Sequence, residues 1–399
     1  MIKAENSQLK IGDLITLDIG PIAHGGHFIS RYKGQVIFVR HAITNEVANV
    51  KITALNSKLA FGDAIEILKL SEKRVLPPCK YSIPEGCGGC DFQHVSIVEQ
   101  RELKKLIIKD QFKRIAKINI NPEVIEVKPE SGLHWRTRLD LAISNNGKIG
   151  LYSSKTKKIT EISECLIAIK AINELDLFKR SWNGDDRISV SVSSENEINV
   201  HRSGKNISGP TKLNEVVDEY SYNISPQSFW QSHKNAPKIL IDTVMKFINL
   251  KLGDRVCDLY GGVGLFTAPI LKIIGKTGEV HLIENNNSCV KDARKIFENN
   301  SNVIVHHGKV EQKIGKIKNI DVILLDPPRN GAGKQVLSQI LDKKPRSIIY
   351  VSCDPASLAR DSKILLDNSY SLDEIVGIDL FPMTQHIECV CSFVFKLNQ

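Results

Sequence analysis

The chain has 399 residues, of which 42% are hydrophobic and 25% charged, proportions that exclude a disordered chain, a collagen and a coiled coil. No stretch free of charged residues is long enough for a membrane-spanning helix, and the length suggests two or three domains. Lysine and arginine outnumber aspartate and glutamate by 54 to 45, which favours polyanionic partners. Since the N-terminus MIKAENSQLK lacks the apolar core of a secretory signal, we expect a cytoplasmic protein.

The first predicted domain spans residues 1–70. Within residues 8–70, short runs alternate apolar and polar positions and are separated by glycines. This pattern is typical of a small, strongly bent antiparallel β-barrel. Pro77-Pro78 ends the segment, and a glycine-rich loop at residues 79–90 follows with three cysteines.

The second predicted domain spans residues 71–222. Residues 97–117 have the pattern of an amphipathic helix with a basic face, ended by Asn121-Pro122, and this helix is a candidate to pack on the next domain. From residue 124 the chain returns to short strand-like runs, beginning with VIEVK. Their spacing predicts a central antiparallel sheet.

The third predicted domain spans residues 223–399. From about residue 236, continuous apolar runs alternate with helical stretches, which indicates a parallel sheet covered by helices on both faces. No internal repeat or low-complexity tract is present.

A glycine-rich turn, Asp258 to Phe266, follows the first strand of this domain, and Glu284 ends the next strand about 20 residues later. The turn and the carboxylate together predict a site for the ribose of an adenosine. The Gly-x-Gly-x-x-Gly pattern of nicotinamide enzymes is absent, and Asp326-Pro-Pro-Arg329 closes a later strand. These features favour a class I methyltransferase that uses S-adenosylmethionine over a dehydrogenase. Arg329 stands where amino-methylating enzymes carry an aromatic residue, which argues against attack by an exocyclic amine.

Two residues are candidates for the chemistry. Cys353 follows an apolar strand and precedes a helical stretch, so the helix N-terminus would favour its thiolate, which can add to an electrophilic ring carbon. Glu388 stands between apolar neighbours and is a candidate proton acceptor. The alternatives are a buried cysteine without function and a solvated glutamate.

The nine cysteines do not suggest a disulfide framework, because their number is odd and we expect no export signal. Metal ligation and catalysis are the interpretations to weigh instead. Four thiolates can hold zinc or an iron–sulfur cluster, and spacing does not choose between the two.

Six ordered motifs give the chain its resemblance to a known family. The chain resembles the S-adenosylmethionine-dependent RNA uracil-C5 methyltransferases, which make 5-methyluridine in bacterial ribosomal and transfer RNA. The motifs are Cys79 with Cys87-Gly-Gly-Cys90-Asp-Phe-Gln-His94, then Ser225-Pro-Gln-Ser-Phe-Trp-Gln231, Asp258 to Phe266, Leu325-Asp-Pro-Pro-Arg329, Ser352 to Asp361, and His386-Ile-Glu388.

The resemblance implies a fold and a mechanism. The N-terminal module would be an RNA-binding TRAM barrel, followed by a central β domain and a Rossmann-like methyltransferase domain. Cys353 would add to uracil C6, C5 would attack the methyl group, and Glu388 would then remove the C5 proton. By the same matching, S-adenosylmethionine would be contacted by Gln231, Tyr260, Glu284 and Asp326. Lys309 lies where relatives often carry Asp or Asn, and we leave it out of the predicted site.

The resemblance also implies that Cys79, Cys87, Cys90 and Cys165 hold a [4Fe-4S] cluster rather than zinc. Their spacing differs from that of radical S-adenosylmethionine enzymes, which favours a structural cluster.

Three alternatives to a ribosomal RNA methyltransferase stay open: a transfer RNA methyltransferase, a non-catalytic RNA-binding ribosome-assembly protein, and a DNA cytosine-C5 methyltransferase. The last usually carries its nucleophile as Pro-Cys, which this chain lacks. We prefer 23S ribosomal RNA as substrate, because the barrel and the four cysteines accompany the ribosomal members more regularly. We expect a monomer that flips its uridine and contacts RNA through the barrel, the basic face of residues 101–117 and residues 134–138.

Overall fold

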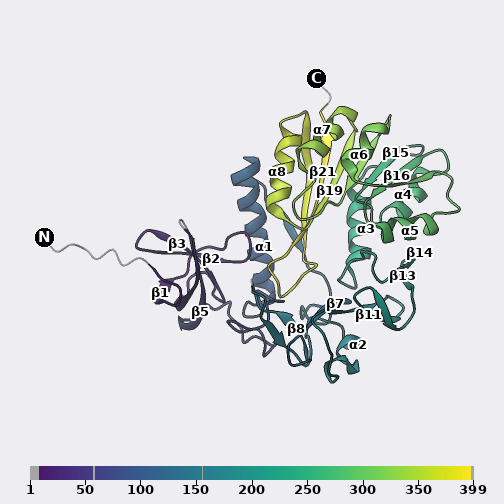
Figure 1. Cartoon of the computed structure of the whole chain (residues 1–399). Coiled ribbons are helices and arrows are strands. Elements are labelled where there is room, and N and C mark those ends of the chain that lie inside the picture. The colour runs from purple at the N-terminus through teal and green to yellow at the C-terminus, as the bar shows by residue number, and fades with distance from the viewer. Residues whose placement is uncertain (1–8, 57–58, 155, 397–399) are drawn as a thin grey trace.

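The computed structural model describes residues 9–56, 59–154 and 156–396. The first eight residues, on which most of the argument about a secretory signal rests, lie outside this part. Figure 1 shows a small sheet on one side of helix α1 (Ile97–Gln111), a large sheet with its helices on the other, and a third group of strands below. Among the described residues, no helix has both the length and the apolar composition needed to cross a bilayer.

The N-terminal part is a five-stranded sheet in the order β1-β4-β5-β3-β2. Its inward positions are apolar, and Ile37, Val39 and Val50 are fully buried. One pair differs from the antiparallel expectation, because β3 and β5 run parallel. The long strand β5 pairs with both β3 and β4 and so bends the sheet around its core. The strands are β1 (Leu14–Asp18), β2 (Phe28–Tyr32), β3 (Gln35–Arg40), β4 (Val47–Leu55) and β5 (Leu59–Lys69).

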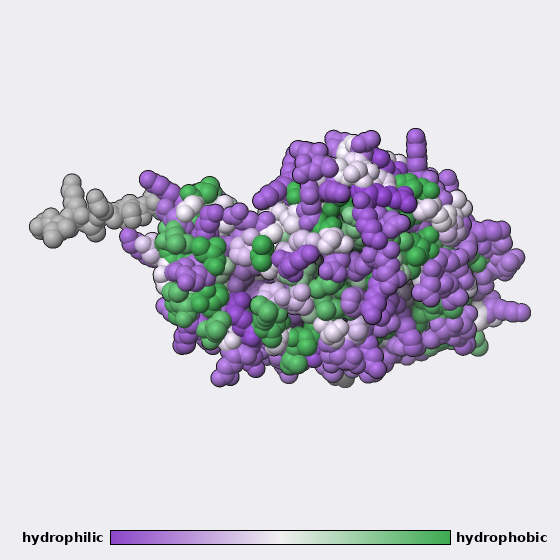
Figure 2. Space-filling view, turned by 90° about the horizontal axis from the view of Figure 1, so that it is seen from below, coloured by the Kyte–Doolittle hydropathy of each residue, from purple (hydrophilic) through white to green (hydrophobic). Residues whose placement is uncertain are grey.

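The outer surface of this sheet carries exposed apolar residues. Leu14 and Leu68 are more than half exposed, and Ile65 nearly so. Figure 2 shows hydrophobic residues gathered at this end of the molecule, while hydrophilic residues cover most of the remaining face in view.

Helix α1 continues as a short π-helix, Phe112–Ala116, and packs on the catalytic part of the chain. Its predicted basic face is only partly available to RNA, because Lys104 is fully buried. The Lys104 ammonium lies 2.6 Å from Asp379 Oδ1 and also donates to the Phe381 carbonyl. Lys104 is therefore a structural residue that ties the helix to the large sheet.

The central part contains a six-stranded antiparallel sheet in the order β12-β11-β10-β7-β8-β9. A short helix, α2 (Lys170–Asn173), and a 3-10 turn, Asp176–Phe178, lie beside it, and a separate hairpin follows it. The sheet consists of β7 (Arg138–Ile143), β8 (Ile149–Tyr152), β9 (Ile159–Glu161), β10 (Arg187–Val192), β11 (Ile198–Arg202) and β12 (Lys205–Ser208), and the hairpin of β13 (Leu213–Val217) and β14 (Tyr220–Ile224).

The prediction that the VIEVK run belongs to this central sheet is wrong. Strand β6 (Glu123–Ile125) instead pairs in parallel with β20 (Tyr370–Ile378) at the edge of the large sheet. The reason is local, since β6 follows directly from α1 and its π-helix, which pack on the catalytic part.

The large sheet has the order β17-β16-β15-β18-β19-β21-β20-β6, and its first five strands are parallel. An entirely parallel sheet was expected, but β21 runs antiparallel to both neighbours. The connection from β20 to β21 is too short for a crossover, so the chain turns back at the same edge. The other strands are β15 (Arg255–Leu259), β16 (Glu279–Glu284), β17 (Val303–His307), β18 (Val322–Leu325), β19 (Ser347–Ser352) and β21 (Glu388–Phe395).

Helices cover both faces of the parallel strands, as Figure 1 shows, and bury one apolar cluster on each face. The strands are apolar on both sides for this reason. The helices are α3 (Ala236–Phe247), α4 (Thr267–Ile274), α5 (Asn287–Ile296), α6 (Val310–Lys313, followed by the 3-10 turn Ile314–Lys316), α7 (Gly333–Lys343) and α8 (Pro355–Leu366).

Candidate active site

The carboxyl ends of the parallel strands open onto a cavity of about 910 Å³. This is the edge at which open α/β sheets gather ligands. The six residues predicted for methyl-donor binding and chemistry all line this cavity, namely Gln231, Tyr260, Glu284, Asp326, Cys353 and Glu388. Lys309, which the prediction left out, lines it as well.

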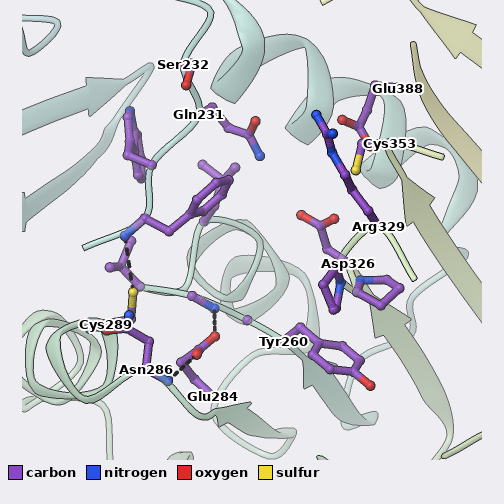
Figure 3. A pocket seen from close by; sticks show the side chains of 18 of the residues that line it. Gln231, Ser232, Tyr260, Glu284, Asn286, Cys289, Asp326, Arg329, Cys353 and Glu388 are labelled. Atoms are coloured by element: carbon purple, nitrogen blue, oxygen red, sulfur yellow. Dashed lines mark hydrogen bonds between the residues drawn. The ribbon is translucent and has the colours of Figure 1, made fainter. Parts of the chain in front are cut away.

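The glycine-rich turn after β15 forms one end of the cavity. Gly264 has φ +94°, and a Cβ there would lie 2.4 Å from the Phe297 ring, so only glycine fits. The Gly262 amide donates to Glu284 Oε2 at 3.0 Å, and the Asn286 amide donates to Oε1 at 2.5 Å. Figure 3 shows these bonds holding the Glu284 carboxylate at the end of the cavity away from Cys353.

Asp258 supports the turn from below and is almost fully buried. Its Oδ2 accepts a hydrogen bond from Thr267 Oγ1 at 2.7 Å. Burial is the main cause that raises the pKa of Asp258 to about 7, and the nearby Glu284 adds to the shift. The carboxyl therefore costs free energy when it ionises in the folded protein.

Asp258→Asn should become more stable relative to the wild type as the pH rises. A carboxyl whose folded pKa exceeds its unfolded value contributes stability below the unfolded pKa and loses it as the pH rises through the folded pKa. Because asparagine does not ionise, the difference in unfolding free energy should shift toward the variant by about 4 kcal/mol between pH 4 and pH 8. Urea denaturation without cofactor measures it. The exposed Asp242→Asn is the control, and a pH-independent difference for Asp258→Asn would contradict the argument.

The segment that carries Gln231 is anchored to helix α5. Asp292 accepts hydrogen bonds from the Ser225 amide at 2.7 Å and from Ser228 Oγ at 2.6 Å. The Phe229 amide contacts Cys289 Sγ at 3.3 Å. Sequence reasoning missed Asp292. The sequence feature that could have identified Asp292 is a carboxylate on the otherwise apolar face of an amphipathic helix.

Cys353 and Glu388 lie at the opposite end of the cavity. Ser352 on β19 pairs with Cys389 on β21, and because β21 is antiparallel, this register places Glu388 beside Cys353. Figure 3 shows both side chains together with Arg329, and Asp326 between them and Tyr260. Glu388 is 5% exposed, and its Oε1 has no hydrogen-bond partner among the described residues.

The electrostatics here differ from the prediction for Cys353. Burial, and after it the carboxyls of Glu388 and Asp326, raise the pKa of Cys353 to about 12, although Arg329 opposes the shift. Burial and the two carboxyls therefore outweigh the effect expected of the helix N-terminus. Burial also raises the pKa of Asp326 to about 7 and that of Glu388 well above its ordinary value.

A smaller cavity of about 230 Å³ meets the same cysteine from the side of the N-terminal sheet. His24 Nε2 lies 3.1 Å from Asp354 Oδ2, and Asp354 in turn caps helix α8 by accepting from the Ser357 amide. Sequence reasoning did not connect His24 with the active site, because nothing local in the sequence predicts this contact.

Arg329 lines both cavities and has no carboxylate partner among the described residues. Its Nη2 lies 3.2 Å from His386 Nε2. Burial lowers the pKa of His386 to about 4, so the neutral ring accepts this hydrogen bond from the guanidinium. Arg329 is thus a fixed cation at the point where the two cavities meet.

The four predicted metal-ligating cysteines line one narrow cavity under the central sheet. Cys87 is held by a β-bridge to Ser153, and burial raises the pKa of its thiol to about 11. In the part of the chain that the structure describes, no three metal-ligating side chains stand close enough to hold a single ion. Arg136 lines both this cavity and the large one.

The fold and the site define a class I methyltransferase: a largely parallel sheet, a glycine-rich turn after its first strand, and a carboxylate after its second. The family model described as tRNA (uracil-5-)-methyltransferase matches residues 210–395. The TRAM domain model matches residues 8–65, which confirms the expectation for the N-terminal module.

Whole-chain relatives identify the family. An uncharacterized RNA methyltransferase of Streptomyces avermitilis is 35% identical over 95% of this chain and 98% of its own. Another from Streptomyces coelicolor is 34% identical over 95% of this chain and 92% of its own. The protein belongs to this family of S-adenosylmethionine-dependent RNA methyltransferases, with a catalytic part of the RNA uracil-5 type.

One solved structure shares the fold over the whole length. It is Pyrococcus abyssi tRNA (uracil-54, C5)-methyltransferase in complex with S-adenosyl-L-homocysteine, with a TM-score of 0.71. The match is 23% identical and covers 95% of this chain and 100% of that one.

Proposed function

We propose that the protein transfers a methyl group from S-adenosylmethionine to C5 of a uridine in 23S ribosomal RNA, through a covalent adduct between Cys353 and uracil C6. The observation that carries this proposal is the register of β19 and β21. It sets a thiol beside a buried carboxyl at one end of a cavity whose other end carries the predicted ribose contact Glu284.

The proposed steps follow from the residues around Cys353. The thiol passes its proton to a water molecule, its sulfur bonds to C6, and the C5–C6 π electrons move onto the uracil O4 as an enolate. S-adenosylmethionine, when bound, would supply the electrophilic methyl group and leave as S-adenosylhomocysteine, while the enolate electrons return to form the bond between C5 and the methyl carbon. After C5 has been methylated, Glu388 accepts the C5 proton, the C5–C6 double bond re-forms, and the C6–S bond breaks to release the sulfur as thiolate.

Access for the uridine is supported by the smaller cavity. A base that reacts at C6 must leave its stack, and its sugar and phosphate must then have space beside Cys353. The cavity beside His24 and Arg329 provides polar groups at this place. Because His24 belongs to the TRAM part of the chain, this part contributes one wall of the proposed substrate entrance.

Transfer RNA is the second candidate substrate. The matching family model is named for transfer RNA, and the structural relative from Pyrococcus abyssi acts on it. We prefer ribosomal RNA because the barrel and the four cysteines accompany the ribosomal members of the resembling family more regularly.

The experiment that tests the function incubates the protein with total unmodified bacterial RNA and methyl-labelled S-adenosylmethionine, and then maps the labelled nucleoside. Label in 5-methyluridine of 23S ribosomal RNA is expected. Label in transfer RNA would identify the second candidate. Label only in methyladenosine or methylcytidine, or no label at all, would overturn the proposal.

We further propose that the four cysteines hold a [4Fe-4S] cluster. The donor set fits such a cluster, because three sulfur ligands from the loop at residues 79–90 and a fourth from Cys165 line one narrow cavity. A single zinc ion would need all four sulfurs about 2.3 Å from one point, whereas a cluster suits thiols that are spread farther apart.

Protein purified without oxygen should be brown and contain about four iron atoms per chain. Cys87→Ser should lose most of this iron, while Cys391→Ser, whose thiol is buried elsewhere in β21, should keep it. Metal analysis and the visible absorption spectrum measure both variants. A colourless protein with one zinc per chain would correct the assignment without affecting the methyl-transfer proposal.

A further inference from the structure

Another cavity, of about 420 Å³, lies on the far side of the segment that carries Gln231. Two residues, Trp230 and Gln231, line both this cavity and the cavity of about 910 Å³. Of their neighbours, Ser232 lines only the 910 Å³ cavity, and His233 lines only the 420 Å³ cavity. The segment 230–234 is thus a partition between the predicted methyl-donor site and a space bounded by the central sheet. Neither the predicted methyl-transfer chemistry nor the four cysteines use this space.

His233 lines this cavity and carries a buried hydrogen-bond donor. The side chain is 1% exposed, and its ring stacks on Trp135 with centroids 5.4 Å apart. Burial lowers the pKa of His233 to about 4, so the ring is neutral at neutral pH. Its Nδ1 accepts from the Asn235 amide at 3.1 Å, and the ring proton must therefore lie on Nε2. This Nε2–H has no partner among the described residues, although buried donors are normally satisfied.

The charges around the cavity favour an anion. Lys170 and Lys234 are exposed at its rim, and neither has a carboxylate partner in the described part of the chain. Glu215 supplies the carboxylate among the described lining residues, but it is already engaged. It accepts from the Ser194 amide at 3.0 Å and lies 3.5 Å from Arg138 Nη2. The groups available to an anion include one buried N–H donor and two ammonium groups, beside neutral polar side chains such as those of Asn196 and Gln231.

We propose that this cavity binds a phosphate group of the substrate RNA, on a nucleotide close to the one that is methylated. The inference rests on the proposed function in one respect, that the substrate is RNA. A phosphate oxygen satisfies the His233 donor, and its charge is complementary to the two lysines. The volume exceeds that of a lone phosphate and suits a nucleotide, and the shared wall places that nucleotide near the reacting base.

The test measures RNA affinity as a function of salt concentration, without methyl donor, for Lys170→Ala, Lys234→Ala and the double variant. The double variant should bind RNA more weakly, and the slope of log affinity against log salt should fall by about 0.7, the value for one single-stranded phosphate contact. Lys179→Ala is the matched control, because this nearby exposed lysine pairs with Asp176 and lines none of the cavities described. If the double variant has the same slope as the control, the proposal is wrong.

His233→Phe tests the buried donor separately. Phenylalanine keeps the stacking on Trp135 and removes Nε2–H, so RNA affinity should fall about tenfold, while S-adenosylhomocysteine affinity stays within about twofold. If His233→Phe has lost affinity for both RNA and S-adenosylhomocysteine, the variant is misfolded. The lysine variants then decide whether the proposed phosphate site exists. Inorganic phosphate and uridine monophosphate are the probes for a free ligand. If either binds in a His233-dependent way while the RNA slope is unchanged, the site serves a free anion and the RNA proposal is overturned.

These measurements do not require methyl transfer. If the proposed methyl transfer does not occur, the RNA affinities can still be interpreted. If the cavity binds no RNA phosphate, the labelled-nucleoside experiment is unaffected.

Discussion

Cys353→Ala is expected to abolish methyl transfer while the protein still binds S-adenosylmethionine. The thiol lies at the end of the cavity opposite Glu284, so its removal should not disturb the predicted ribose contact. Without a sulfur to add to C6, uracil C5 is too weak a nucleophile, and the rate should fall at least about 10⁴-fold. Turnover with labelled donor and calorimetric titration with S-adenosylhomocysteine measure the two properties on the same preparation.

Cys391→Ala is the matched control for this experiment. Cys391 is fully buried in β21 and lines neither of the cavities that meet at Cys353. Its loss should cost about 1 kcal/mol of stability and leave the rate within about twofold. If Cys353→Ala keeps a comparable rate, the covalent mechanism is wrong.

Glu388→Gln is expected to leave the RNA covalently attached to the protein. Glutamine has the same shape, so sulfur addition and methylation of C5 can proceed, but it cannot accept the C5 proton and the C6–S bond stays closed. Labelled RNA should migrate with the protein in a denaturing gel, and turnover should fall about 10³-fold.

Two further variants control this result. Glu374→Gln, an exposed residue on neighbouring β20, should behave as the wild type. The double variant Cys353→Ala with Glu388→Gln should form no adduct, because the sulfur is missing. An absent adduct in Glu388→Gln alone, with the protein folded, would show that another group is the base. The carboxyl of Asp326, which lines the same cavity, would then be the next candidate.

The sequence determined the parts of the site that depend on local structure. Asp258, Gly262 and Glu284 belong to a strand, a turn and the following strand, and such units fold in the same way wherever they occur. Because parallel strands share one carboxyl edge, the sequence also predicted that Asp326 and Cys353 would meet there, as they do.

Tertiary structure decided what depends on pairing between distant segments. The antiparallel course of β21 brings Glu388 beside Cys353, and the pairing of β6 with β20 moved residues 123–125 out of the predicted central sheet. The alternation of apolar and polar residues in a strand is the same whichever strand it pairs with and in whichever direction it runs. The local sequence therefore does not show which partner or direction the strand will take.

Tertiary structure also decided the state of the ionisable groups. Lys104 has the sequence context of a basic helix face, yet it is buried against Asp379. The thiol of Cys353 was predicted to be favoured as a thiolate, yet burial and two carboxyls raise its pKa. Charges respond to every neighbour within several ångströms, and most of those neighbours are brought together only when the chain has folded.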